Sequence, residues 1–86
     1  MEVNFESIVI LIATQAMINL GEIKNPITGN SELNLRGAEI YIKQLEILKE
    51  KTENNLNDKE NIFLEDMLKN LKILYNNKLK NNVKEN

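Results

Sequence analysis

Paired carboxylates are the residues of this sequence whose types and spacing come closest to a chemical site. Glu46 and Glu50 lie four residues apart, which places them on one face of a helix, and Glu65 is followed directly by Asp66. Two carboxylates that share a buried site can divide general acid and general base roles or hold a metal ion. Here they alternate with lysines at positions 43, 49 and 69. That alternation is typical of a solvated helix face with salt bridges, and we predict this role for them.

Nucleophilic catalysis lacks its usual activating base in this chain. The hydroxyls of Ser7, Ser31 and Thr52 have no imidazole to accept a proton, because the sequence contains no His. The absence of Cys also removes thiol nucleophiles and thiolate metal ligands. Neither a calcium-binding loop nor a glycine-rich phosphate-binding loop occurs. We therefore expect no catalytic residue, no metal site, no cofactor and no enzyme activity.

A basic grouping near the C-terminus raises nucleic-acid binding as an alternative. Lys69, Lys72 and Lys80 fall roughly on one side of a helix, where they can reach phosphates. Against this, Glu65 and Asp66 lie close by, the chain contains a single Arg, and no set of aromatic side chains is available for stacking on bases. The formal net charge is −2. We rank weak nucleic-acid binding third among the functions considered.

The length of 86 residues predicts one small domain, near the size at which a single core is only marginally sufficient. Chains of this size gain stability from disulfides, metals or oligomerisation, and without Cys or His only oligomerisation remains. Absence of Cys also fits a reducing compartment, so we expect a cytoplasmic protein.

One apolar segment stands out in this otherwise polar chain, at residues 7–21 (SIVILIATQAMINLG). It is too short and too interrupted to cross a membrane, and acidic residues rather than basic ones precede it, unlike a secretory signal. We predict a helix over residues 4–20, with Asn4 as N-cap and Gly21 as terminator. Two apolar stripes result, the first formed by Phe5, Ile8, Val9, Ile12 and Ala16 and the second by Leu11, Ile18 and Leu20.

The rest of the chain predicts two further helices that follow a connector over residues 21–34, where Gly29 and Asn30 favour a turn. Helical apolar spacing and an asparagine N-cap at Asn34 place the second helix at residues 35–53. The third spans residues 58–79, opened by a capping box of Asn57 and Glu60. The short loop between the two favours an antiparallel hairpin. We expect one domain over residues 1–80 and a disordered, basic and polar tail over residues 81–86.

The chain also resembles the small bacterial family described as domain of unknown function 1844, over roughly residues 3–76. The order and spacing of several short patterns carry this resemblance: Leu20-Gly21-Glu22, Pro26, Gly29, Asn34-Leu35, Ala38, Leu45-x-x-Leu48, Lys51-Thr52, Asn55-Leu56, Glu60, Leu64, Leu68 and Leu71. The family pattern differs at four positions of this chain, with His at Asn19, Asp at Lys43, Gly at Asn54 and Arg at Lys72. The resemblance implies a small cytoplasmic helical protein and supplies no activity and no catalytic residue.

Together these patterns predict an all-α, three-helix domain that dimerises through its N-terminal helix. A helical hairpin can cover about one side of that helix, and its remaining aliphatic side chains need a further cover. The interface candidates on the first and second helices are Ile8, Leu11, Ile12, Met17, Ile18, Ile40 and Ile47. We expect a non-catalytic homo-oligomeric interaction or adaptor module, with itself and an unidentified protein as partners. The alternative is a peripheral membrane or membrane-complex accessory that uses the same helix.

Overall fold

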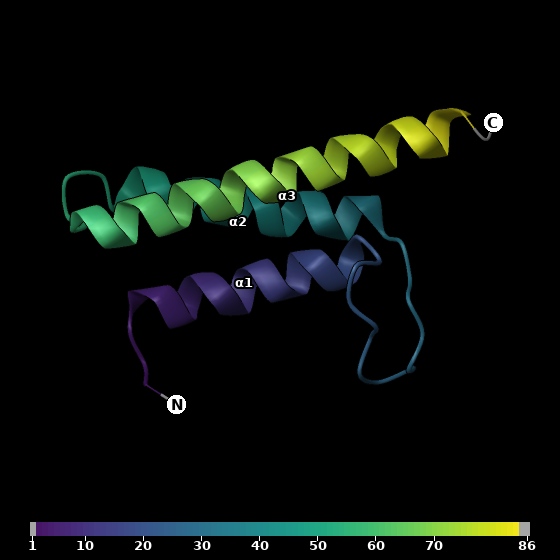
Figure 1. Cartoon of the computed structure of the whole chain (residues 1–86), viewed down its shortest axis with the longest axis horizontal. Coiled ribbons are helices and arrows are strands. Elements are labelled where there is room, and N and C mark those ends of the chain that lie inside the picture. The colour runs from purple at the N-terminus through teal and green to yellow at the C-terminus, as the bar shows by residue number, and fades with distance from the viewer. Residues whose placement is uncertain (1, 85–86) are drawn as a thin grey trace.

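The structure, a computed structural model, describes residues 2–84, and the side chains of residues 2–81. It consists of three helices: α1 (Phe5–Asn19), α2 (Leu35–Lys51) and α3 (Asp58–Lys84). The helices α1 and α3 run in the same direction, and α2 is antiparallel to both (Figure 1). The predicted all-α fold with an antiparallel α2–α3 hairpin is confirmed.

Asparagine side chains begin all three helices, as the sequence predicts. The Asn4 carboxamide oxygen accepts from the Ser7 backbone N–H at 2.9 Å, and the Asn34 oxygen accepts from the Gly37 N–H at 3.0 Å. Before α3, the Asn57 oxygen accepts from the Glu60 N–H at 2.8 Å, and a Glu60 carboxylate oxygen accepts from the Asn57 N–H at 3.0 Å. Each cap satisfies backbone donors that have no partner within the helix.

The predicted stop signal of the first helix also holds, whereas the second helix ends at Lys51, two residues before its predicted end. Gly21 adopts a left-handed φ of 78°, and the N–H of Glu22 donates to the Met17 carbonyl at 3.0 Å, which closes α1 with a Schellman motif. Asn54, just beyond α2, has a φ of 68°. Asparagine tolerates this conformation better than most residues that carry a side chain.

The third helix is longer than predicted. It continues to Lys84 rather than ending at residue 79, so the prediction of a disordered tail is wrong for residues 81–84. Residues 80–84 contain neither Gly nor Pro, and nothing in their sequence stops a helix that is already propagating. Residues 85 and 86 of the predicted tail lie outside the described residues.

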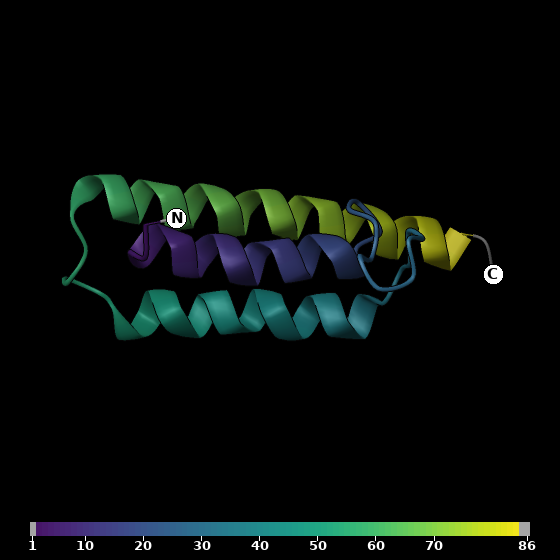
Figure 2. The ribbon, with the colours of Figure 1, turned by 90° about the horizontal axis from the view of Figure 1, so that it is seen from below.

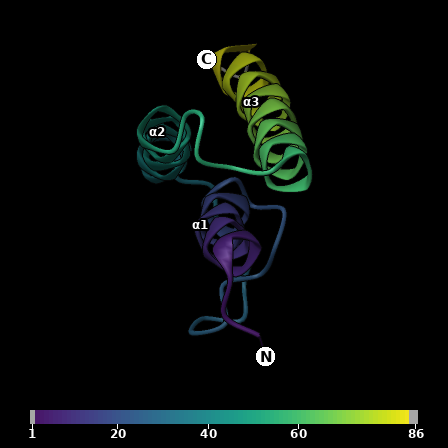
Figure 3. The same cartoon turned by 90° about the vertical axis from the view of Figure 1, so that its left-hand side faces the viewer.

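The core lies where α1 rests in the groove between α2 and α3 (Figures 2 and 3). One stripe from each helix and one residue after α1 supply it: Val9, Ala13, Ala16 and Leu20; Ala38, Ile42 and Leu45; Leu64, Leu68 and Leu71. The buried stripe of α1 is therefore turned relative to the predicted one, because Ala13 and Leu20 point inward and Ile8 points outward. Alanines on α1 and α2 permit the two backbones to approach closely.

The connector between α1 and α2 is a folded turn rather than a strand pair. Leu20 and Leu33 form one isolated antiparallel bridge, and the N–H of Asn25 donates to the Asn30 carbonyl at 2.9 Å. Gly29 takes a φ of 74° at the predicted turn. The connector leaves the bundle on the side of α1 that faces away from the α2–α3 hairpin (Figures 1 and 3).

Candidate interaction surface

The side of α1 opposite the hairpin is uncharged and open. We call it the outer face of α1, and it comprises Ser7, Ile8, Ile10, Leu11, Thr14, Gln15 and Ile18. Leu11 is 64% exposed and Ile8 is 46% exposed, although both are large aliphatic residues. Between Ser7 and Gly21 the sequence contains no charged residue. A helix face without charge can be apposed to another protein without desolvating an ion.

The structure separates the interface candidates of α1 into two groups. Ile8 and Leu11 lie exposed on the outer face, and Ile18 is half-buried beside them. Ile12 and Met17 are half-buried and pack against the core, so the hairpin already satisfies much of their surface. Ile10, which the sequence analysis left out of the candidates, is exposed at the edge of the face. Because aliphatic residues occur on every side of this helix, its sequence does not indicate which of them are buried in the core.

Two segments beside α1 add exposed aliphatic residues on the same side of the molecule. The interface residues predicted from the sequence include neither segment. Residues 2–4 and the connector project from the two ends of α1, on the side away from the hairpin (Figures 1 and 3). They carry two of the most exposed large hydrophobic residues of the described chain, Val3 at 86% and Ile27 at 92%. Leu33 and Ile23 of the connector are exposed as well. The aliphatic residues of the connector are too sparse to form a sheet. That was the sequence feature from which their exposure could have been predicted.

The remaining interface candidates, Ile40 and Ile47, lie exposed on the side of α2 that faces solvent. They are seven residues apart on a face that also carries Arg36, Lys43 and Glu50. Single surface aliphatics among charges are common in soluble proteins, whereas contiguous apolar patches mark contact surfaces. The outer face of α1 is therefore the better candidate.

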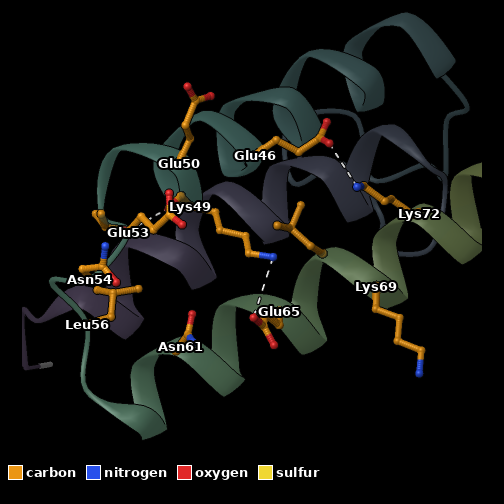
Figure 4. A pocket seen from close by; sticks show the side chains of 12 residues that line it. Glu46, Lys49, Glu50, Glu53, Asn54, Leu56, Asn61, Glu65, Lys69 and Lys72 are labelled. Carbon is orange, nitrogen blue, oxygen red and sulfur yellow. Dashed lines mark hydrogen bonds and ion pairs between the residues drawn. The ribbon is translucent and has the colours of Figure 1, made fainter.

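The carboxylates considered for chemistry belong instead to the seam between α2 and α3. A Glu46 oxygen lies 3.0 Å from Lys72 Nζ, and a Glu65 oxygen lies 3.7 Å from Lys49 Nζ, so two ion pairs cross between the helices (Figure 4). These side chains border an open, polar pocket of about 920 Å³. All four are about half exposed, so each pair contributes less than about 1 kcal/mol to folding.

A second small hollow of about 240 Å³ lies farther along the same seam. There the Tyr75 hydroxyl donates to a Glu39 carboxylate oxygen at 3.3 Å, and Lys43 Nζ lies 3.2 Å from the other oxygen of that carboxylate. The Lys43 ammonium, through its hydrogen bond and its charge, and then the Tyr75 hydrogen bond lower the pKa of Glu39 from its ordinary value. Burial, followed by the negative charge of Glu39, raises the pKa of Tyr75 from its ordinary value. Both shifts favour the ordinary protonation states at neutral pH, which suits a structural contact.

Residues 2–84 contain neither a metal-binding cluster of acidic side chains nor a helix able to span a membrane. Among residues 2–84, no three acidic side chains gather closely enough to hold a metal ion. Within the same residues, no helix combines the length and apolarity needed to traverse a bilayer.

A family model described as domain of unknown function (DUF1844) matches residues 2–77, which include α1, the connector, α2 and most of α3. The chain belongs to the DUF1844 family. No curated protein and no solved structure matches it. The DUF1844 match supplies no activity.

The structure explains several residues that carry the DUF1844 resemblance. Ala38, Leu45, Leu64, Leu68 and Leu71 are buried in the core, so this part of the pattern specifies the packing of the three helices.

Three departures from the family pattern are compatible with the same fold. The left-handed φ of Asn54 accounts for the family's Gly at that position. Lys43 and Lys72, where the family has Asp and Arg, each have an acidic partner in this protein, in Glu39 and Glu46 respectively.

Proposed function

We propose that this DUF1844 protein is a non-catalytic interaction module that self-associates, most simply as a homodimer, through the outer face of α1. The exposure of Leu11 in the middle of a charge-free helix face carries this proposal. Full burial of a Leu or Ile side chain is worth about 1.5–3 kcal/mol. Several such side chains on one face amount to a substantial part of the roughly 5–15 kcal/mol by which a domain is stable.

A second copy of the chain is the simplest cover for this face. Most soluble oligomers are symmetric homo-oligomers, and a charge-free face can meet its own copy without like-charge repulsion. Membrane attachment is the less favoured alternative, because interfacial helices usually carry Lys and Arg. The acidic residues Glu6 and Glu22 flank the charge-free stretch instead.

The adaptor role follows from what self-association would leave free. The seam between α2 and α3, with its polar pocket, lies away from the outer face of α1 and stays accessible to another protein. A non-enzymatic role is supported by the absence of His and Cys and by the ion pairs that engage Glu46 and Glu65. We place the protein in the bacterial cytoplasm, on the basis of the family resemblance and the Cys-free sequence.

The test is the molar mass in solution, measured by light scattering over a dilution series. We expect a dimer for the natural chain. The double substitution Leu11→Asp and Ile18→Asp should raise the dissociation constant by about 100-fold or more, because apposition would then bury unpaired carboxylates. Ile62→Asp, on the solvent-facing side of α3, is the matched control and should leave the mass unchanged.

Two results would contradict the proposal. The first is a monomeric natural chain, and the second is a dimer whose mass is unaffected by the double substitution. Co-sedimentation of a monomeric chain with neutral phosphatidylcholine vesicles would favour the membrane alternative.

A further inference from the structure

We infer that Thr14 and Gln15 of one copy face Thr14 and Gln15 of the other copy in the self-associated protein, where their side chains exchange hydrogen bonds. This inference rests on the proposed self-association through the outer face of α1. It adds the residues that determine which partner this face accepts, and it holds for a parallel and for an antiparallel pair of helices.

Thr14 and Gln15 differ from the other uncharged polar residues of α1 in how their side chains are bonded. The Ser7 hydroxyl donates to the Asn4 carbonyl at 2.7 Å, and Asn19 Nδ2 donates to the main-chain carbonyl of Gln15 at 2.7 Å. Within the described part of the chain, no such side-chain hydrogen bond engages the Thr14 hydroxyl or the Gln15 carboxamide. The single chain therefore leaves both groups available to a partner.

Helix formation does not account for a threonine at position 14. A helical threonine hydroxyl commonly donates to the carbonyl four residues earlier, and Thr52 does so to the Leu48 carbonyl at 2.7 Å. Thr14 makes no such bond within the described chain, it is not part of the apolar core, and threonine is a poorer helix former than leucine or alanine. A role on the outer face of α1 accounts for it better.

The two polar side chains lie between the aliphatic residues Leu11 and Ile18 of the same face. Each is three or four residues from both of them, so helical spacing places all four side chains on one side of α1. Thr14 lies on one side of the line that joins Leu11 and Ile18, and Gln15 lies on the other. A second helix that packs along this line therefore removes both polar groups from water.

The chemistry of the two side chains selects the groups that face them. A hydroxyl or a carboxamide that loses water without gaining a hydrogen bond destabilises a complex. Both groups donate and accept, so Thr14 and Gln15 can bond to their own counterparts or to each other. The first pairing suits an antiparallel pair of helices, and the second suits a parallel pair. A purely aliphatic helix offers neither, so this pair of residues favours a second copy over such a partner.

An exchange of charge tests this inference. One variant carries Thr14→Glu with Gln15→Glu, a second carries Thr14→Lys with Gln15→Lys, and light scattering over a dilution series follows each alone and both in equimolar mixture. We expect each variant alone to raise the dimer dissociation constant by about 100-fold or more, because like charges then meet. The mixture should have a dissociation constant at least about ten-fold below that of either variant, because carboxylates then face ammonium groups.

Gln44 provides the matched control, because it is an exposed glutamine on α2. Chains with Gln44→Glu and Gln44→Lys should keep the natural molar mass, both alone and mixed.

Cysteine substitutions give a second measurement that adds no charge to α1, and this measurement decides the question if circular dichroism shows that the charged variants lose helix. The natural chain contains no Cys. Thr14→Cys and Gln15→Cys chains are unfolded together, refolded together and oxidised, and a disulfide forms only where Cα atoms approach within about 7 Å. We expect covalent dimers in at least about five-fold excess over those of a Gln44→Cys chain at the same concentration.

The outcomes separate this inference from the proposed function. Folded charged variants that keep the natural dissociation constant, or whose mixture associates no more tightly than its separate chains, would overturn the facing of the two polar pairs. A dimeric protein without the cysteine cross-link would overturn it as well. In these cases the substitutions Leu11→Asp and Ile18→Asp still decide self-association through the outer face. A monomeric natural chain would overturn both.

Discussion

At the scale of single residues, a close approach between the end of α1 and the start of α2 depends on a glycine. A Cβ built at Gly37 would overlap the Asn19 carboxamide oxygen and lie 2.9 Å from the carbon that carries it. Asn19 has little freedom to move aside, because its Nδ2 donates to the Gln15 carbonyl at 2.7 Å and its own carbonyl accepts from the Asn34 N–H at 2.6 Å. The absence of a side chain at position 37 is thus what lets α2 begin against the end of α1.

We predict that Gly37→Ala destabilises the fold by about 1 kcal/mol, since overpacking costs about 1–3 kcal/mol and exceeds the gain in helix propensity. In an Asn19→Ala background the main obstruction is gone, and only Asn34 Nδ2, at 3.0 Å from the added Cβ, has to shift slightly. Gly37→Ala should then be neutral or stabilise by up to about 1 kcal/mol. Urea unfolding of the four proteins measures this double-mutant cycle. An equal effect of Gly37→Ala in both backgrounds would show that the two residues are not coupled.

At the scale of elements, an asparagine cap begins each of the three helices. The capping box at the start of α3 satisfies two backbone N–H groups after a loop of only a few residues. The same cap fixes where α3 begins, and so contributes to the placement of α3 in the hairpin that covers α1.

We predict that Asn57→Ala lowers the free energy of unfolding by about 1 kcal/mol, the usual cost of a lost N-cap. Asn70→Ala is the matched control, because Asn70 is exposed inside α3 and alanine is the better helix former there. It should be neutral or slightly stabilising. Urea unfolding compares the two variants, and a cost that is equal at both positions would contradict a capping role for Asn57.

At the scale of the whole molecule, a small core and an uncovered helix face occur together. The described core consists of ten buried residues, nine in the three helices and Leu20 just after α1, which is modest support for a domain of this size. On α1, Ile8, Ile10 and Leu11 remain exposed. Stability should therefore be shared between folding and association, and the free energy of one should depend on the other.

We predict that the melting temperature of the natural chain rises with protein concentration, by about 3–5 °C for each ten-fold increase, as for a two-state dimer of this size. The substitution Leu11→Asp should abolish this dependence, because the monomer then unfolds alone. Scanning calorimetry or circular dichroism over a hundred-fold concentration range provides the measurement. A constant melting temperature of the natural chain would indicate that folding does not depend on self-association.

Interactions between near neighbours in the chain were accessible from the sequence. The three asparagine caps, the Gly21 terminator and the left-handed Asn54 involve groups within a few residues of one another, so their partners are known once the sequence is known. The core stripes of α2 and α3 were accessible too, because polar residues predominate on their remaining sides and only isolated isoleucines interrupt them. The all-α fold follows from these local signals.

Only the tertiary structure decided which side of α1 is buried, how far α3 extends and where the connector lies. The polar residues Ser7, Thr14 and Gln15 of the apolar segment are interspersed with aliphatic ones, so the sequence fits several rotations about the helix axis. Packing against α2 and α3 selects one of them. The partners of Glu46 and Lys49 across the seam depend in the same way on how two helices are placed. Hydrogen bonds between near neighbours in the chain can be predicted from the sequence. Which of several similar helix faces is buried depends on the helices that pack against it.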